Sequence, residues 1–264
     1  MAKAQYNDPL YDVSGRVVVI TGACGLIGKV VANAFHERGA KLVVTDIEAA
    51  QPEHFAATFG HEAIGRACDV SKASEVDSLV NHAIDRFKRV DVLVNCHQYK
   101  PKGFLEAKAE SFPDELWDAV IGVNLTGAFL TCRDFGRVML EQGKGSIVNF
   151  ASTYGVVSSN PDLYEGNSLG NPLAYSVSKA GVIMLTKYLG AYWGARGVRV
   201  NCVSPHGVSN NHEPAFIEKF SAKSPMKRLM EAREILGAVL FLASDASSYA
   251  TGSNVLVEGG WTIW

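Results

Sequence analysis

The chain has 264 residues, of which 47% are apolar, so it is long enough to bury a large core as one domain over residues 1–264. With a net charge of −2 and no basic stripe, it offers no electrostatic reason to bind nucleic acid. Its start lacks the apolar core of a signal peptide, and no run approaches the roughly 20 apolar residues of a membrane span. We therefore expect a soluble, cytoplasmic protein with no membrane partner.

The chain begins with the pattern of a strand, a glycine-rich turn and a helix. The apolar run at 17–20 leads into TGACGLIG and then into a helical pattern that ends at Gly39. Glycines let the backbone turn sharply and approach a ligand, while free N–H groups at a helix start attract a pyrophosphate. The alternative is an ordinary tight loop between a strand and a helix, which can contain similar glycines. As a dinucleotide turn, the motif predicts cofactor contacts at Gly22, Cys24, Gly25, Leu26, Ile27 and Gly28.

A second apolar run, KLVVT, ends at Asp46 and Ile47. A carboxylate about 20 or more positions after such glycines can accept hydrogen bonds from the adenosine ribose and repel a 2′-phosphate. The sequence therefore predicts NAD rather than NADP, unless Asp46 is only a surface carboxylate. Asp69 and Val70 follow the next apolar stretch, where Asp69 could hold the adenine amino group, cap a helix starting near Ser71, or both.

Strand and helix patterns continue to alternate along the chain. Strands are expected at 91–95, 146–152, 198–204 and in NVLVEGG, and helices at about 116–139, around Tyr175, and at about 231–243. This alternation predicts a doubly wound α/β fold, with a parallel sheet of about seven strands and helices on both faces. Ligands bind outside the carboxyl ends of the strands in such sheets, which is where Asn95, Ser152 and Pro205 fall.

Tyr175 and Lys179 lie one helical turn apart and so share a helix face. A phenol has an ordinary pKa of about 10, and a neighbouring cation favours its ionised form, which allows tyrosine to act as a general acid or base. A YxxxK motif also arises by chance on amphipathic helices, so it indicates a catalytic role only in combination with the glycine turn and Asp46.

The five cysteines are odd in number and widely spaced, which indicates reduced thiols used as small core residues. The sequence has no CxxC motif, and its seven histidines are scattered. We therefore expect no metal site.

Several motifs and single residues stand in the order and at about the separations typical of the short-chain dehydrogenase/reductase superfamily. They are TGACGLIG, CDV, Asn95, Asn124, Ser152, YSVSK, RVNCVSPHGV and YATGSNVLVEGGWT. The chain resembles that superfamily from about Gly15 to Thr262. The resemblance implies a Rossmann fold, a nicotinamide cofactor, a homo-oligomer (tetramer or dimer), and a catalytic set that matches Asn124, Ser152, Tyr175 and Lys179.

The resemblance also implies a role for each catalytic residue. Tyr175 would take the hydroxyl proton in alcohol oxidation, and Ser152 would steady the substrate oxygen. Lys179 would lower the pKa of Tyr175 and hold the nicotinamide ribose. Asn124 would position a water in the proton relay, although a buried asparagine that mends a helix irregularity would look the same.

Several positions depart from the pattern of the superfamily. Leu26 replaces the middle glycine of the usual turn, which gives a form found in longer relatives. Cys96, His97, Gln98 and Tyr99 stand where a flexible Ala-Gly pair is usual, and their larger side chains would narrow that side of the cleft. His206 takes a glycine position, while Val208 could still offer backbone groups to the nicotinamide amide. Residues 205–225 lack strong periodicity and are expected to form a mobile lid over the cofactor.

About ten residues more than usual separate Ser152 from Tyr175, and we regard residues 153–172 as an insert beside the site. It is polar, and its hydroxyl, amide and carboxylate groups suit a polyhydroxylated ligand such as a sugar. A surface loop or a subunit contact is the alternative. The candidate substrate residues are His97, Tyr154, Tyr164 and His206.

The expected function is that of an NAD(P)-dependent oxidoreductase, which moves a hydride between nicotinamide and a secondary alcohol or ketone of a sugar derivative in glycan biosynthesis. ASTYG, LYEGN and SPHGV resemble a bacterial subgroup associated with flagellin modification and surface sugars. The alternatives are a general 3-oxoacyl-type ketone reductase, an NAD-dependent epimerase or dehydratase, and a non-catalytic dinucleotide sensor. A sensor would not need Ser152, Tyr175 and Lys179 together.

Overall fold

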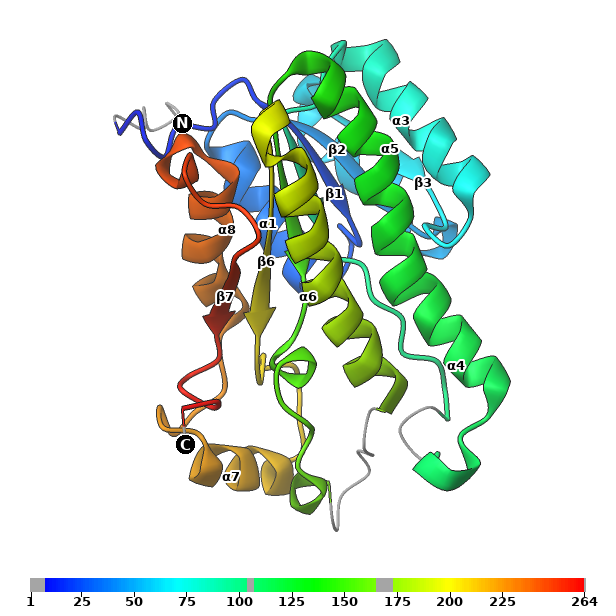
Figure 1. Ribbon diagram of the computed structural model, residues 1–264, viewed down its shortest axis with the longest axis vertical. Coiled ribbons are helices and arrows are strands. Elements are labelled where there is room, and N and C mark those ends of the chain that lie inside the picture. Colours follow the sequence, from blue (N-terminus) through cyan, green and yellow to red (C-terminus); the bar gives the residue numbers. More distant parts are fainter. Residues whose placement is uncertain (1–7, 104–106, 165–172, 264) are drawn as a thin grey trace.

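A computed structural model describes residues 8–103, 107–164 and 173–263 (Figure 1). Within these ranges seven parallel strands form one sheet in the order β3-β2-β1-β4-β5-β6-β7. The prediction of a parallel sheet of about seven strands is therefore confirmed. The strands are β1 (Val17–Thr21), β2 (Lys41–Asp46), β3 (Ala63–Ala67), β4 (Val92–Asn95), β5 (Gly145–Phe150), β6 (Val198–Pro205) and β7 (Asn254–Val257).

Helices cover both faces of the sheet, as the alternation predicted. Helices α1, α2 and α8 pack on one face, and α3, α5 and α6 pack on the other (Figure 1). The described helices are α1 (Leu26–Glu37), α2 (Pro52–Ala57), α3 (Ala73–Phe87), α4 (Asp114–Ile121), α5 (Gly127–Gln142), α6 (Leu173–Trp193), α7 (Pro214–Lys223) and α8 (Leu236–Ala243).

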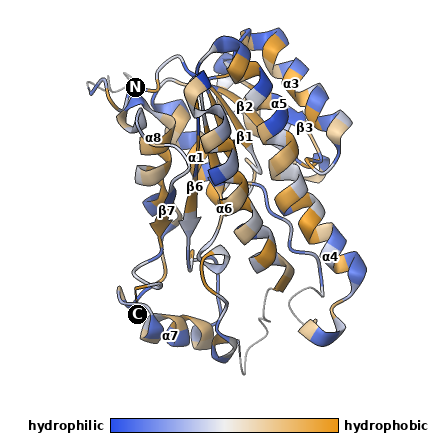
Figure 2. Ribbon diagram, in the orientation of Figure 1, coloured by the Kyte–Doolittle hydropathy of each residue, from blue (hydrophilic) through white to orange (hydrophobic). Residues whose placement is uncertain are grey.

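The central strands are continuous apolar runs because both of their faces are buried. Along β1, Val18 and Ile20 pack against α1 and α8, whereas Val17 and Val19 pack against α3 and α5. Figure 2 shows these hydrophobic strands between the two helical layers. Strand order reverses between β1 and β4, so a ligand crevice is expected at the carboxyl ends of these two strands.

Three elements differ from the sequence prediction. The long helix runs from Asp114 to Gln142, but a π-helical turn at Gly122–Thr126 interrupts it and separates α4 from α5. Residues 205–225 contain α7, which the weak periodicity concealed because only Phe216 and Phe220 are buried on it. The first turn of the helix expected from about 231 is a 3₁₀ turn, and α8 begins at Leu236.

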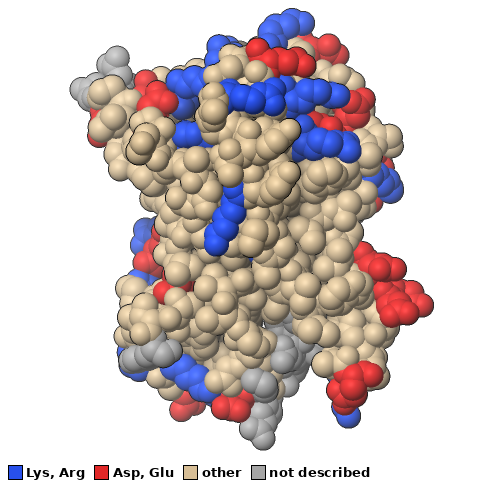
Figure 3. All heavy atoms as spheres, viewed as in Figure 1, with Lys and Arg blue, Asp and Glu red and all other residues tan. Residues whose placement is uncertain are grey.

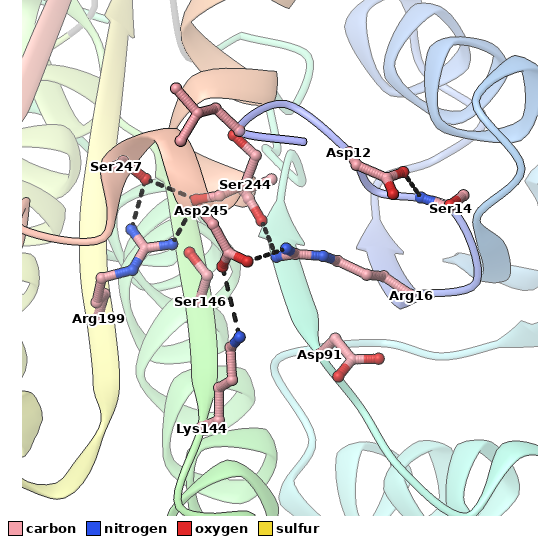
Figure 4. A network of polar contacts seen from close by, with 12 residues as sticks. Asp12, Ser14, Arg16, Asp91, Lys144, Ser146, Arg199, Ser244, Asp245 and Ser247 are labelled. Atoms are coloured by element: carbon pink, nitrogen blue, oxygen red, sulfur yellow. Dashed lines mark hydrogen bonds and ion pairs between the residues drawn. The ribbon is translucent and has the colours of Figure 1, made fainter. Parts of the chain in front are cut away.

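A polar network joins the amino-terminal edge of the sheet to the residues after α8 (Figure 4). Asp245 pairs with Arg16 at 2.9 Å and with Lys144 at 3.5 Å, and Arg199 donates to the carbonyls of Leu242 and Ser244. Arg16, Lys144 and Arg199 stand at the start of parallel strands, so the network lies at the opposite edge from the expected crevice. No helix in the described part of the chain is long and apolar enough to cross a membrane.

Candidate active site

A cavity of about 860 Å³ opens at the carboxyl edge of the sheet. Three of the predicted residues, Cys24, Asn95 and Asn124, do not line it. The predicted residues that do line it are Gly22, Gly25, Leu26, Ile27, Gly28, Asp46, Ile47, Asp69, Val70, His97, Ser152, Tyr154, Tyr164, Tyr175, Lys179, Pro205, His206 and Val208.

The glycine turn forms one wall of the cavity. Gly22 has a φ of +64°, and a Cβ atom there would come within 2.7 Å of the His97 backbone, so only glycine fits this approach of two loops. Helix α1 begins at Leu26 after the N-cap residue Gly25, which has no side chain to cap the first turn. The N–H groups of that turn are therefore available to an anionic ligand.

Asp46 fixes the turn as well as facing the cavity. Its carboxylate accepts a hydrogen bond from the Cys24 backbone N–H at 3.0 Å and another from the Ile47 N–H at 2.9 Å. Cys24 thus contributes a backbone tie behind the turn rather than a lining side chain. A glycine turn, an uncapped helix start and a carboxylate at the end of β2 together fit the adenosine and pyrophosphate parts of a dinucleotide.

Asp69 lines the same end of the cavity but does not cap a helix. Its carboxylate accepts from the backbone N–H of Ser71 at 3.0 Å and from the Ser71 hydroxyl at 2.6 Å. Helix α3 begins only at Ala73, so the alternative in which Asp69 caps a helix near Ser71 is wrong. The side chain instead closes a short turn that holds its carboxylate in place.

Asn95 belongs to a buried chain of polar groups under the cavity. Its amide nitrogen donates to Asn149 Oδ1 at 2.9 Å, and its Oδ1 accepts from Thr21 at 3.2 Å. Asn149 in turn donates to the Thr186 hydroxyl at 3.0 Å, which links β1, β4 and β5 to α6. Since Asn95 is 3% exposed, it supports the site from below.

His97 is also tied into the scaffold, although it lines the cavity. Its Nδ1 lies 2.6 Å from the Thr21 hydroxyl, and its ring also bonds to the Val123 backbone. Burial lowers the pKa of His97 to about 3, so the imidazole is neutral and has one N–H to donate. The imidazole therefore joins the end of β1 to the π-helical turn.

Asn124 lies in the π-helical turn and is 1% exposed. Its Oδ1 accepts from the Tyr99 backbone N–H at 2.7 Å, and its amide nitrogen donates to the Ser178 hydroxyl at 3.3 Å. The alternative of a buried asparagine at a helix irregularity is thus what the structure shows. The amide joins the loop after β4 to α6, and its part in a proton relay stays a prediction.

Ser152, Tyr175 and Lys179 meet where β5 ends against α6. Gly155 makes this contact possible, because a Cβ atom there would lie 2.7 Å from the Lys179 carbonyl carbon. Ser152 is 4% exposed and hydrogen-bonds the Tyr175 side chain. The Lys179 Nζ donates to the Phe150 carbonyl at 2.7 Å and lies 5.7 Å from the Tyr175 ring centroid.

The electrostatics of this group differ from the sequence expectation. Burial raises the pKa of Tyr175, and the hydrogen bond from Ser152 only partly opposes it. Burial also lowers the pKa of Lys179 to about 8, so its charge is itself disfavoured. Lys179 was expected to lower the pKa of Tyr175. Desolvation instead raises the pKa of the phenol above its ordinary value of about 10, so the phenol is protonated at neutral pH.

The Tyr175 end of the cavity, away from the glycine turn, is aromatic. Tyr164 donates to the Tyr154 hydroxyl at 2.6 Å, and the His206 ring lies 4.5 to 4.9 Å from the rings of Tyr154, Phe220 and Trp261. Burial lowers the pKa of His206 to about 4. Its Nε2 is buried and has no hydrogen-bond partner within the described structure.

The described part of the insert is joined to α7. Asp162 pairs with Lys223 at 3.3 Å, and its backbone carbonyl accepts from Lys219 at 3.2 Å. Phe216 and Phe220 of α7 line the cavity with Tyr164. The described part of the insert and the segment 205–225, which was expected to form a lid, thus lie at the same end of the cavity. Residues 165–172 of the insert lie outside the described residues.

Lys100 is a cavity residue that the sequence did not single out. Its Nζ lies 5.5 Å from the Tyr175 ring centroid. The larger residues after Asn95 predicted that this side of the cleft is narrower. They did not predict a role for Lys100, because the sequence of a loop does not show the direction in which a lysine side chain points.

Three comparisons with known proteins agree with this geometry. The family model described as enoyl-(acyl carrier protein) reductase matches residues 22–262. The D-threitol dehydrogenase of Mycolicibacterium smegmatis is 34% identical over 276 residues, which cover 100% of both chains. The structure of a short chain dehydrogenase from Leptospira borgpetersenii with bound NAD+ has a TM-score of 0.86 and 31% identity, covering 97% of this chain and 96% of its own.

A second solved structure carries the other nicotinamide cofactor. It is a gluconate 5-dehydrogenase from Burkholderia cenocepacia in complex with NADP and tartrate, with a TM-score of 0.87 and 27% identity over 97% of this chain and 98% of its own. Relatives of this chain therefore include binders of NAD and of NADP.

Proposed function

The chain belongs to the short-chain dehydrogenase/reductase superfamily, and from that premise we propose that it interconverts a secondary alcohol and a ketone of a polyhydroxylated compound, with NAD as the preferred cofactor. It is an NAD(P)-dependent oxidoreductase that acts on CH–OH groups. The observation that carries the proposal is the meeting of Ser152, Tyr175 and Lys179 at one end of a cavity that has the glycine turn and Asp46 at the other.

The reaction needs a hydride acceptor, which the oxidised nicotinamide supplies when bound. Tyr175 and Ser152 can both hydrogen-bond one substrate oxygen, because their side chains already bond each other. In the reductive direction the protonated phenol gives its proton to the ketone oxygen as the carbon receives a hydride. In the oxidative direction the phenolate takes the alcohol proton, and Ser152 donates to the oxygen as negative charge develops on it.

The preference for NAD follows from Asp46. Its carboxylate lies beside the glycine turn, where the adenosine ribose is expected, and it would repel a phosphate on the 2′ position. Gly22, Gly25, Leu26, Ile27 and Gly28 would hold the pyrophosphate, Asp69 and Val70 the adenine, and Pro205 and Val208 the nicotinamide.

Two kinds of observation favour a polyhydroxylated substrate. D-threitol dehydrogenase and gluconate 5-dehydrogenase, by their names, act on such compounds. In this chain the hydroxyls of Tyr154 and Tyr164 and the imidazole of His206 line the cavity near Tyr175, and buried polar groups discriminate well between hydroxylated and deoxygenated ligands. A role in glycan biosynthesis and the closer flagellin-modification subgroup stay predictions.

We also propose that the enzyme is a homo-oligomer that packs through α5 and α6. Phe129, Met184, Tyr188 and Tyr192 are 43%, 62%, 65% and 64% exposed. Figure 3 shows few charged side chains in the middle of this face. Apolar side chains gathered in this way favour a contact with a second copy. The five cysteines are free, which fits a reducing compartment, so we place the enzyme in the cytoplasm.

The test is nicotinamide absorbance during turnover over a panel of polyols, aldonic acids, sugar phosphates, nucleotide-linked sugars and simple secondary alcohols, with NAD and NADP in parallel. Tyr175→Phe serves as the blank. We expect an NAD-linked signal with a polyhydroxylated compound that the blank lacks. Signal with simple alcohols alone would overturn the substrate class, and tight NADH binding with no turnover across the panel would favour the sensor.

A further inference from the structure

Lys100 places a positive charge beside the catalytic tyrosine. It lies in the loop after β4 and lines the cavity, and its Nζ is 5.5 Å from the Tyr175 ring centroid. Its charge reaches groups of two other elements. After burial, the Lys100 charge contributes to lowering the pKa of His212, and it also contributes to lowering the pKa of Lys179. Lys100 is therefore positioned toward the substrate end of the cavity.

No described carboxylate neutralises Lys100. Lys72, Lys144 and Lys223 each lie within 4 Å of an aspartate or glutamate, whereas Lys100 forms no ion pair within residues 8–103, 107–164 and 173–263. Asp118 also lines the cavity but is not paired with Lys100. Lys100 is exposed at the mouth of the cavity, and partial desolvation by the cavity walls lowers the pKa of its ammonium. An unpaired cation that faces a cavity attracts an anion that enters it and can donate charge-assisted hydrogen bonds to that anion.

We propose that Lys100 binds a carboxylate or phosphate group of the substrate, so that the enzyme acts on an anionic polyhydroxy compound, such as an aldonic acid or a sugar phosphate, rather than on a neutral polyol. This inference rests on the proposed function, because it names the charge of the ligand at the same site. The anionic group lies close to the reacting carbon, because Lys100 and Tyr175 are neighbours.

The surroundings of Lys100 fit such a group. His212 stacks on Phe216 with ring centroids 5.0 Å apart, and its Nδ1 accepts from the Asn210 backbone N–H at 3.2 Å. Both rings line the cavity. Lys100 lies beside the Tyr175 ring and its charge acts on Lys179 and His212, whereas the cofactor phosphates are expected at the glycine turn. The charge is therefore assigned to the substrate.

The test compares three four-carbon probes that differ in charge: threitol, threonate and threitol phosphate. We would measure kcat/KM for each probe with the wild type, Lys100→Met, Lys100→Arg and the control Lys102→Met. Lys102, two residues away, is exposed like Lys100 but does not line the cavity. We expect Lys100→Met to lower kcat/KM for threonate or threitol phosphate by about 10- to 100-fold, as for loss of one charge-assisted hydrogen bond. Threitol should change less than threefold, Lys100→Arg should keep most of the anion preference, and the control should match the wild type.

The relative response to the two anions identifies the group. A loss confined to threonate assigns a carboxylate, and one confined to threitol phosphate assigns a phosphate. Equal losses for threitol and both anions would overturn the proposal. If Lys100→Met raised the KM for NAD as much as the KM for the substrate, the proposal would also be overturned, because Lys100 would then bind a phosphate of the cofactor.

A binding measurement separates this inference from the proposed function. Threonate and threitol phosphate are titrated by calorimetry into NADH-saturated Tyr175→Phe enzyme, with and without Lys100→Met. Binding that depends on Lys100, without turnover of any probe by the wild type, would support the anion site and reject the proposed reaction. Turnover of threitol with no Lys100-dependent anion binding would support the reaction and reject the anion site.

Discussion

The two ends of the cavity are built in different ways. Beside Asp46, the groups that face a ligand are mostly backbone groups. They belong to the glycine turn, to the uncapped start of α1, and to two loops that lie so close together that a Cβ atom would not fit between them. Beside Tyr175 they are side chains drawn from β5, α6, the insert and residues 205–220. Added atoms damage a backbone site, whereas removed or altered atoms damage a side-chain site. Substitutions of side chains can therefore change the ligand bound beside Tyr175 without changing the backbone groups beside Asp46.

Removing one oxygen at the side-chain end should have the largest effect. Tyr175→Phe deletes the hydroxyl that we propose as proton donor and acceptor but leaves the ring in place, so kcat should fall by about 10³-fold. The dissociation constant of NADH, measured by fluorescence titration, should change little because the opposite end is untouched. Residual activity within tenfold of the wild type would show that another group moves the proton.

Adding one carbon at the backbone end is the reciprocal change. Gly22→Ala places a Cβ atom within 2.7 Å of the His97 backbone at a φ of +64°, which should cost about 2–4 kcal/mol of stability and weaken NADH binding at least tenfold. Gly15→Ala is the matched control, because its φ is +69° but no atom lies within 4 Å of the added carbon. Equal losses in both variants would mean that backbone strain, not the close approach, decides the outcome.

The buried imidazole of His206 should make stability depend on pH. Its folded-state pKa of about 4 lies below the ordinary 6.5, so the unfolded chain binds more protons between these values and stability falls as pH drops from 6.5 to 4. The loss attributable to His206 is roughly 3 kcal/mol.

His206→Phe should therefore flatten the acid limb of stability measured by urea unfolding at several pH values, with part of the slope remaining from His97. The exposed His61, replaced in the same way, is the control. An unchanged acid slope in His206→Phe would contradict the assignment.

The smallest expected effect is on the choice of cofactor. Asp46→Asn removes the charge but keeps an oxygen that can accept from the Cys24 N–H, so the turn should survive. The ratio of kcat/KM for NAD to that for NADP should fall by about tenfold, as for one lost charged interaction. If Asp46→Ala changes the ratio no more than Asp46→Asn does, but also weakens binding of both cofactors, the tie to Cys24 has a separate role.

Sequence patterns predicted the cofactor end better than the substrate end. The glycine turn and Asp46 belong to a contiguous strand-turn-helix unit, so their spacing alone places them together. The use of Asn95 and Asn124 inside the scaffold was harder to foresee, because it depends on partners such as Asn149 and Ser178 that are distant in the chain. Lys100 and α7 were missed for a similar reason: a loop side chain has no periodicity, and two buried phenylalanines make a weak helical signal.

The π-helical turn at Gly122–Thr126 has a consequence beyond its own hydrogen bonds. A π turn accommodates one extra residue, and one residue of an α-helix corresponds to a rotation of about 100°. Everything after the turn, including the exposed Phe129 of α5, is therefore rotated relative to α4 by the same irregularity that brings Asn124 to Tyr99 and Ser178. A single-residue deletion there would turn the outer face of α5 and withdraw the Asn124 amide at the same time, so the proposed subunit contact and the geometry of the cavity both depend on the register of this helix.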